Sequence, residues 1–183
     1  MPSVEKVRPA RCPCCGSASR PTGGRLRLHG HGRRGRQMLG PLEPLGEPTM
    51  LGVSCRRYLC VACKAVVLVV PSGMLQGRRY SGPAIAQALA LFGLEGASPA
   101  KVRCRTSPDK ILGAAASAGW VSLGRWCDAV RNGGLFPEVR ACPASFTRRQ
   151  VAERAASTIG GRAPPPVSSS LVVRAFVGAA RAA

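Results

Sequence analysis

The chain has 183 residues, with 27 Lys and Arg against 8 Asp and Glu, and its formal charge of +19 favours a polyanionic partner such as nucleic acid. The longest strongly apolar run, residues 65–70, is far short of the roughly 20 residues that cross a bilayer. No apolar segment follows the basic residues 1–11, as it would in a secretory signal. We therefore expect a cytoplasmic protein, nucleoid-associated if bound to DNA, with neither a membrane nor a small-molecule substrate as partner.

Composition also predicts a metal ion. In a reducing compartment, the nine cysteines bind metal more readily than they form disulfides. Only 4% of the residues are aromatic, so the core is expected to be thin, and small domains of this kind often need a metal to hold them.

The expected fold class is small α+β, in which a four-cysteine zinc ribbon of short antiparallel strands precedes a mainly helical, helix-turn-helix-like region. We expect residues 1–10 to be a disordered N-terminus, 11–76 the zinc ribbon and 77–134 the helix-turn-helix-like region. Residues 135–183 are expected to form a helical and linker tail that is partly disordered, with a linker composition over residues 160–170.

Two Cys-x-x-Cys pairs lie in the first region, between β-prone stretches at residues 25–28, 54–59 and 65–70. Cys12 and Cys15 form the first pair, and Cys60 and Cys63 the second. Four thiolates satisfy tetrahedral zinc, and Gly16 tolerates the positive φ that the turn after the first pair requires. A closed four-sulfur site leaves no position for water, so the motif predicts one structural Zn²⁺.

The spacing leaves alternatives open. The 44 residues between Cys15 and Cys60 exceed the usual gap of about 15–20, and the turn-rich residues 40–48 would absorb the excess as a longer hairpin. Cys14 and Cys55 compete as ligands. If no metal is bound, the cysteines are expected to be free thiols or to form a disulfide. A zinc deaminase site is not expected, because no glutamate follows His29 or His31 at the required spacing.

Helix start signals recur through the second region. Ser81 followed by Pro83 predicts a helix over residues 82–93, and Ser98-Pro99 and Ser107-Pro108 repeat the signal. The helix after Pro108 is expected to end near Gly119 with one apolar face, formed by Ile111, Leu112 and Ala115.

Two further helices are expected towards the C-terminus, besides a short apolar one at residues 171–182. Ser122 is expected to cap a helix with an apolar stripe of Leu123, Trp126, Cys127 and Val130. Thr147 and Gln150 form a capping box for a helix over residues 147–157.

The order of motifs resembles a known family. After the first cysteine pair come LHGHGRR at residues 28–34, RRYLCVACK at 56–64, RRYS at 78–81 and GWVSLGRW at 119–126. This order resembles the N-terminal zinc-ribbon plus helix-turn-helix region of bacterial insertion-sequence transposases, and small stand-alone proteins of unknown function that share it. The resemblance covers roughly residues 11–131. It implies binding to DNA, with Arg125 on the DNA-facing side of the second helix of the pair.

The chain departs from that family at two points, since residues 97–106 interrupt the helical pair and Gly124 weakens the second helix. The three metal-holding carboxylates of a transposase catalytic domain are not expected after the ribbon, so the sequence predicts a binding protein and not an enzyme. The alternatives are a ribbon that binds RNA or single strands, and a zinc-stapled protein-interaction adaptor. The expected contacts with duplex DNA are ten arginines: Arg25, Arg27, Arg33, Arg34, Arg36, Arg56, Arg57, Arg78, Arg79 and Arg125.

Overall fold

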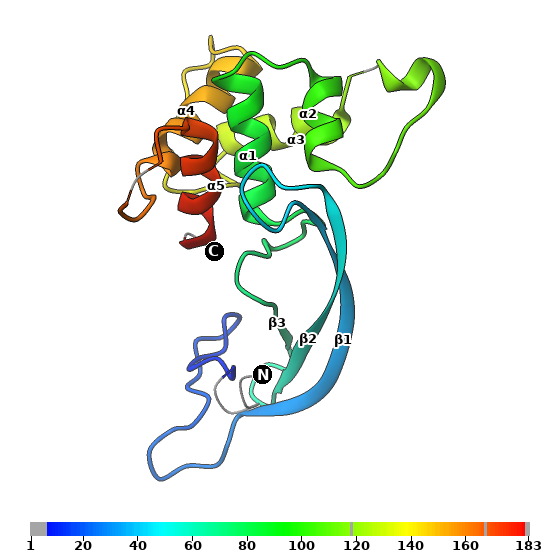
Figure 1. Cartoon of the computed structure of the whole chain (residues 1–183). Coiled ribbons are helices and arrows are strands. Elements are labelled where there is room, and N and C mark those ends of the chain that lie inside the picture. The colour runs from blue at the N-terminus through cyan, green and yellow to red at the C-terminus, as the bar shows by residue number, and fades with distance from the viewer. Residues whose placement is uncertain (1–6, 118, 167, 182–183) are drawn as a thin grey trace. The chain divides into compact units, whose positions relative to one another are not determined.

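A computed structural model of the chain describes residues 7–117, 119–166 and 168–181 (Figure 1). The expected disorder of residues 1–10 falls largely on residues 1–6, which lie outside the described residues. Three strands form an antiparallel sheet in the order β1-β2-β3, and five α-helices follow, so the small α+β class is confirmed. The elements are β1 (Leu28–Gly40), β2 (Thr49–Cys60), β3 (Val66–Val69), α1 (Gly82–Gly93), α2 (Pro99–Thr106), a 3-10 helix (Gly113–Ala116), α3 (Val121–Arg131), α4 (Arg148–Gly160) and α5 (Leu171–Arg181).

The chain divides into two compact units. The ribbon unit comprises residues 1–37 and 52–71, and the helical unit comprises residues 38–51 and 72–183. The end of the β1–β2 hairpin, residues 38–51, therefore groups with the helices, although the sequence motifs place it within the ribbon. Backbone contacts explain this grouping, since Leu39 N–H donates to Arg79 O (2.8 Å) and Ser81 N–H donates to Leu39 O (3.1 Å).

In the ribbon unit, β2 pairs with β3 in a register that sets Tyr58 opposite Val67 and Arg56 opposite Val69. Side chains alternate between faces along a strand, so Tyr58 and Cys60 share one face. That face is buried in a small cluster formed by Cys12, Leu28, Tyr58 and Cys60. Hence the core of this unit is built around the cysteine pairs themselves.

In the helical unit, α1 packs against α2, α3, α4 and α5, and α4 also packs against α3 and α5 (Figure 1). Small residues allow these close approaches: a Cβ at Gly93 would lie 2.3 Å from the backbone nitrogen of Glu153, and one at Gly178 would lie 2.0 Å from Ile159 O. Residues Ala84–Ala90 of α1 are almost fully buried at the centre of the unit.

Three of the predicted helix starts are confirmed at the level of single hydrogen bonds. The hydroxyl of Ser81 accepts from Ala84 N–H (3.1 Å), and that of Ser98 accepts from Lys101 N–H (3.3 Å). Thr147 forms the predicted capping box at the start of α4. The predicted apolar stripe of α3 is also buried, with Trp126 only 3% exposed.

Two helix predictions are wrong. Between Pro108 and Gly119 the described residues form no α-helix but only the 3-10 helix; Ile111 and Leu112 are 42% and 85% exposed, and Gly113 has a φ of +70°. The Ser107 hydroxyl accepts hydrogen bonds from Asp109 N–H (3.3 Å) and from Tyr80 Oη (2.8 Å), so its local bond alone does not start a helix. Ser122 is also not an N-cap, since α3 begins one residue earlier with Trp120 in the capping position and no side-chain cap.

Candidate metal centre and basic surfaces

The two cysteine pairs lie on turns with the same backbone pattern. In the first, Gly16 N–H donates to Cys12 O (2.9 Å) and Cys12 N–H donates to Ser17 O (2.9 Å). In the second, Lys64 N–H donates to Cys60 O (2.8 Å) and Cys60 N–H donates to Ala65 O (3.0 Å). The residue after each pair is left-handed, with φ of +70° at Gly16 and +63° at Lys64. Each turn thus directs two sulfurs towards the same side of the chain.

The four sulfurs meet in one cluster. The ligand atoms of Cys12, Cys15, Cys60 and Cys63 all lie within 4.8 Å of one another. Cys12 Sγ is 3.7 Å from Cys63 Sγ, and Cys15 Sγ is 3.8 Å from Cys60 Sγ. These separations are far beyond the ~2.05 Å of a disulfide, and all four cysteines are free thiols. They are instead the separations of four ligands around a single metal ion.

The environments of Cys15, Cys60 and Cys63 shift the pKa values of these thiols in different directions. Hydrogen bonding with Ser17, whose hydroxyl lies 3.3 Å from Cys15 Sγ, lowers the pKa of Cys15 to about 6. The backbone hydrogen bond with Cys63 lowers the pKa of Cys60. The pKa of Cys63 is raised to about 12, since burial and the neighbouring sulfurs outweigh its backbone hydrogen bond with Ala65. At least part of the cluster is therefore predisposed to the thiolate form that binds metal.

The competing ligands lie outside this cluster. Among the described residues, the four-cysteine set is the one group of His, Cys, Asp or Glu side chains placed to hold a metal, and it contains neither Cys14 nor Cys55. Cys14 is exposed and Cys55 is buried as a free thiol. His29 is engaged locally, with Nε2 2.9 Å from Leu26 O.

The expected nucleic-acid contacts of the ribbon unit lie mostly on its surface. Arg25, Arg27, Arg33 and Arg34 are exposed, while Arg36, Arg56 and Arg57 are partly buried. The guanidinium of Arg56 lies over β1, where a Cβ at Gly30 would be 2.8 Å from Arg56 Nη2. Residues 7–37 and 52–71 carry eleven Arg and Lys and no Asp or Glu. Across its described residues the ribbon unit is thus strongly basic, and the side chains of Arg33, Arg34 and Arg36 make no hydrogen bond or ion pair there.

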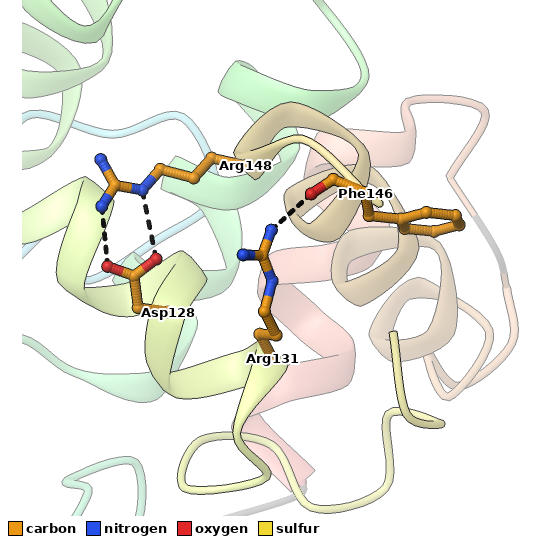
Figure 2. Close-up of polar contacts among 4 residues, drawn as sticks. All are labelled: Asp128, Arg131, Phe146 and Arg148. Atoms are coloured by element: carbon orange, nitrogen blue, oxygen red, sulfur yellow. Dashed lines mark hydrogen bonds and ion pairs between the residues drawn. The ribbon is translucent and has the colours of Figure 1, made fainter. Parts of the chain in front are cut away.

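Many arginines of the helical unit, by contrast, are engaged in internal contacts. Figure 2 shows Arg148 on α4 pairing with Asp128 on α3 through two hydrogen bonds of 3.1 and 2.8 Å, and Arg131 donating to Phe146 O. Gly124 leaves room for the first pair, because a Cβ there would lie 3.2 Å from Arg148 Nη1. Arg149 and Arg154 likewise donate to backbone carbonyls, of Phe92 and Ala141.

The three remaining arginines predicted to bind DNA belong to the helical unit. Arg78 and Arg79 precede α1, Arg125 lies on α3, and all three line one pocket with Tyr80 and Trp120. In the sequence, Arg79 and Arg125 are 46 positions apart in two separate motifs, and no pattern indicates that they share a pocket. Arg103 also lines this pocket and was missed, because its role depends on how α2 packs.

No helix in the described part of the chain is long and apolar enough to span a membrane. In comparisons with known proteins, no protein-family model, curated protein or solved structure matches this chain.

Proposed function

We propose that this chain is a zinc-ribbon protein that binds duplex DNA through the arginines of its ribbon unit, and that it has no catalytic role. The observation that carries the proposal is the coincidence, in one small unit, of a four-sulfur cluster with eleven basic residues and no described acidic one. The order of motifs supports a relation to the N-terminal regions of insertion-sequence transposases.

The sulfur geometry favours zinc as the metal. A tetrahedron with metal–sulfur bonds of about 2.3 Å has edges of about 3.8 Å. The Cys12–Cys63 and Cys15–Cys60 sulfur separations, 3.7 and 3.8 Å, agree with that edge. Four thiolates in tetrahedral geometry select Zn²⁺ or an iron–sulfur centre, and a single ion fits a cluster whose ligand atoms span at most 4.8 Å. With all four positions filled by sulfur, the zinc would be structural.

The charge of the ribbon unit favours a polyanion as the partner. Exposed Arg33 and Arg34 and partly buried Arg36 lie on β1, and their side chains make no hydrogen bond or ion pair within the described part of the chain. A guanidinium of this kind is available for paired hydrogen bonds to phosphate oxygens. Folding around zinc would hold these arginines on a fixed strand, which lowers the entropy lost when DNA binds.

Salt dependence of binding to duplex DNA tests this proposal. Each neutralised phosphate contributes a log–log slope of about −0.9, so replacing Arg33, Arg34 and Arg36 with Ala should flatten the slope by up to about 2.7. The matched control replaces Lys101, Arg105 and Arg140, exposed cations of the helical unit, and should leave the slope unchanged. Fluorescence anisotropy over a salt series measures both variants. An unchanged slope in the ribbon variant would contradict the proposal and favour the adaptor role.

Matched ligands separate the remaining alternatives. Single-stranded DNA and RNA of the same length should bind more weakly than the duplex, since the chain has few aromatic side chains on which bases stack. Stronger binding to single-stranded DNA or to RNA would identify that ligand, and not duplex DNA, as the partner. The relation to transposases predicts that Arg125→Ala weakens preference for a selected DNA sequence, because a recognition helix contacts base edges in the major groove.

A further inference from the structure

The pocket that joins Arg78, Arg79 and Arg125 has a volume of about 330 Å³ and lies wholly within the helical unit. Its walls combine basic side chains with the hydroxyl groups of Tyr80, Ser107 and Ser122. The Tyr80 hydroxyl donates to Ser107, so the guanidinium groups and the Ser122 hydroxyl are the donors that suit an anion with several oxygens in this concave site.

The segment that carries Arg78 and Arg79 is held in place by backbone hydrogen bonds. Arg78 N–H donates to Leu75 O (3.1 Å), and Arg79 O accepts from Leu39 N–H (2.8 Å). Both bonds fix the loop directly before α1, so the guanidinium groups extend from an ordered segment. Arg78 is partly buried, and its side chain makes no hydrogen bond or ion pair with another described residue that would compete for a ligand.

The start of α3 also lines the pocket. This helix has no side-chain cap: Leu123 N–H donates to Trp120 O (3.1 Å), and the N–H groups before it in the first turn have no intrahelical partner. Ser122 and Arg125 lie in the first turns and line the pocket. Their position adds the positive end of a helix dipole to the arginine cluster, which favours an anion there.

Electrostatics in the pocket favour a negatively charged ligand even after internal contacts are discounted. Four arginines line it against one carboxylate, that of Asp109. Arg103 is only 6% exposed and donates to the carbonyls of Ala115 and Ala116, so it contributes charge more than free donors. The aromatic floor is rigid, since Tyr80, Trp120 and Trp126 pack edge to face with centroids 4.9 to 5.7 Å apart.

We propose that this pocket binds a phosphate group, held by Arg78 and Arg125 with the hydroxyl of Ser122. The group would come either from a phosphomonoester, such as a nucleotide or a strand end, or from the backbone of a nucleic acid. This site goes beyond the DNA-binding surface of the ribbon unit, because it uses another unit and needs no zinc.

Tryptophan fluorescence tests the site directly, because the chain has only two tryptophans, Trp120 and Trp126, and both line the pocket. Inorganic phosphate should change the emission saturably, whereas chloride at equal ionic strength should not. Arg78→Gln and Arg125→Gln should each weaken phosphate binding by roughly 10- to 100-fold, the effect of losing one charge-assisted hydrogen bond. Arg140→Gln, which removes an exposed cation outside the pocket, should leave it unchanged.

Adenosine monophosphate and an oligonucleotide without a terminal phosphate distinguish the two sources when each competes with inorganic phosphate. Competition by the nucleotide assigns the pocket to phosphomonoesters, and competition by the oligonucleotide alone assigns it to the backbone. Arg125→Lys, which keeps the charge without the paired donors, should lose part of the affinity and serves if a Gln variant does not fold. A chloride-like response to phosphate, or equal affinity in the Arg78, Arg125 and Arg140 variants, would overturn the proposal. Either result leaves the ribbon's DNA binding intact, because the ribbon is tested through different residues.

Discussion

The ribbon unit and the helical unit solve the problem of a small core in different ways. Among the described residues, the buried apolar cluster of the ribbon is Cys12, Leu28, Tyr58 and Cys60, so half of it consists of cysteines from the four-sulfur cluster. The helical unit instead buries a cluster that draws on α1 through α5, with Ile85, Leu89 and Ile159 fully covered. Burial at about 25 cal/mol per Å² can hold the second unit together, but little apolar area is available in the first.

The two units also use arginine differently. The helical unit has fifteen basic and seven acidic residues, and several arginines satisfy carbonyl groups or carboxylates within it. The described ribbon has eleven basic residues and no acidic one. Mutual repulsion of those charges opposes folding of the ribbon. The comparison teaches that arginine stabilises the fold where it is paired internally, as at Arg148. It remains available to a partner where its side chain has no internal hydrogen bond or ion pair, as at Arg33 and Arg34.

Removal of the metal should have the largest effect and should act on one unit alone. Structural zinc supplies on the order of 10 kcal/mol of apparent binding free energy in small fingers, so chelation should unfold the ribbon and leave the helical unit folded. Thiol labelling at pH 8 measures this, since Cys12 and Cys60 should become reactive. Cys127 should stay unlabelled, because burial raises its pKa to about 11 and keeps it protonated below that pH. Equal labelling of Cys127 after chelation would show that the units unfold together.

A substitution in the helical unit should produce the opposite pattern. A Cβ at Gly93 would lie 2.3 Å from Glu153 N and 2.8 Å from the carbonyl carbon of Ala152, so Gly93→Ala forces α1 away from α4. Overpacking of this kind costs typically 1–3 kcal/mol. Denaturant unfolding followed by tryptophan fluorescence should report the loss, while the zinc content should not change. Gly119→Ala, where a Cβ meets open space, is the control and should be near neutral.

The turn after the first cysteine pair sharpens the comparison within the ribbon. Gly16 has a φ of +70°, a conformation that costs an L-residue roughly 1–2 kcal/mol. Gly16→Ala should therefore weaken zinc retention against a chelator by about that amount, whereas Lys64→Gly should strengthen it, since Lys64 already bears such strain at +63°. Gly35→Ala, with ordinary φ and open space around its Cβ, should have no effect. Equal zinc retention in all three variants would show that the turns do not govern the site.

The smallest expected effect concerns the capping box of α4. Thr147 Oγ1 accepts from Gln150 N–H (3.3 Å), and Gln150 Oε1 accepts from Thr147 N–H (2.8 Å). Thr147→Ala removes the first bond and should destabilise the helical unit by about 1 kcal/mol. The change is measurable by denaturant unfolding, with Ser157→Ala on the exposed face of the same helix as the control. A loss no larger than that of the control would mean that the cap contributes nothing.

The sequence predicted the local features of this protein and missed those that depend on packing. The starts of α1, α2 and α4 follow from Ser81, Ser98 and Thr147, because a cap is made within four residues. Ser107-Pro108 carries the same signal, and the Ser107 hydroxyl does accept from Asp109 N–H (3.3 Å), but no α-helix forms there and Tyr80, 27 residues away, donates to the same hydroxyl. No local pattern reports such a distant contact.

The same distinction holds for the sites. The cysteine pairs were visible in the sequence because each turn is built from a short run of consecutive residues, 12–17 and 60–65, and the hairpin between them only had to bring the two turns together. The shared pocket of Arg78 and Arg125 could not be predicted, since it exists only when α3 packs beside the loop that precedes α1. The buried stripe of α3 was readable from its spacing, but its partners, among them Tyr80, were not.

Native mass spectrometry of the purified full-length chain tests the central claim most directly, that one zinc ion bound to four cysteines organises the ribbon. The account predicts one zinc per chain, because the four-sulfur cluster fits a single tetrahedral ion. The zinc should be lost in the double variant Cys12→Ser, Cys15→Ser and kept in the control double variant Cys104→Ser, Cys142→Ser. Full zinc occupancy in the first variant, or a wild-type chain that binds no zinc when supplied with it, would contradict the account.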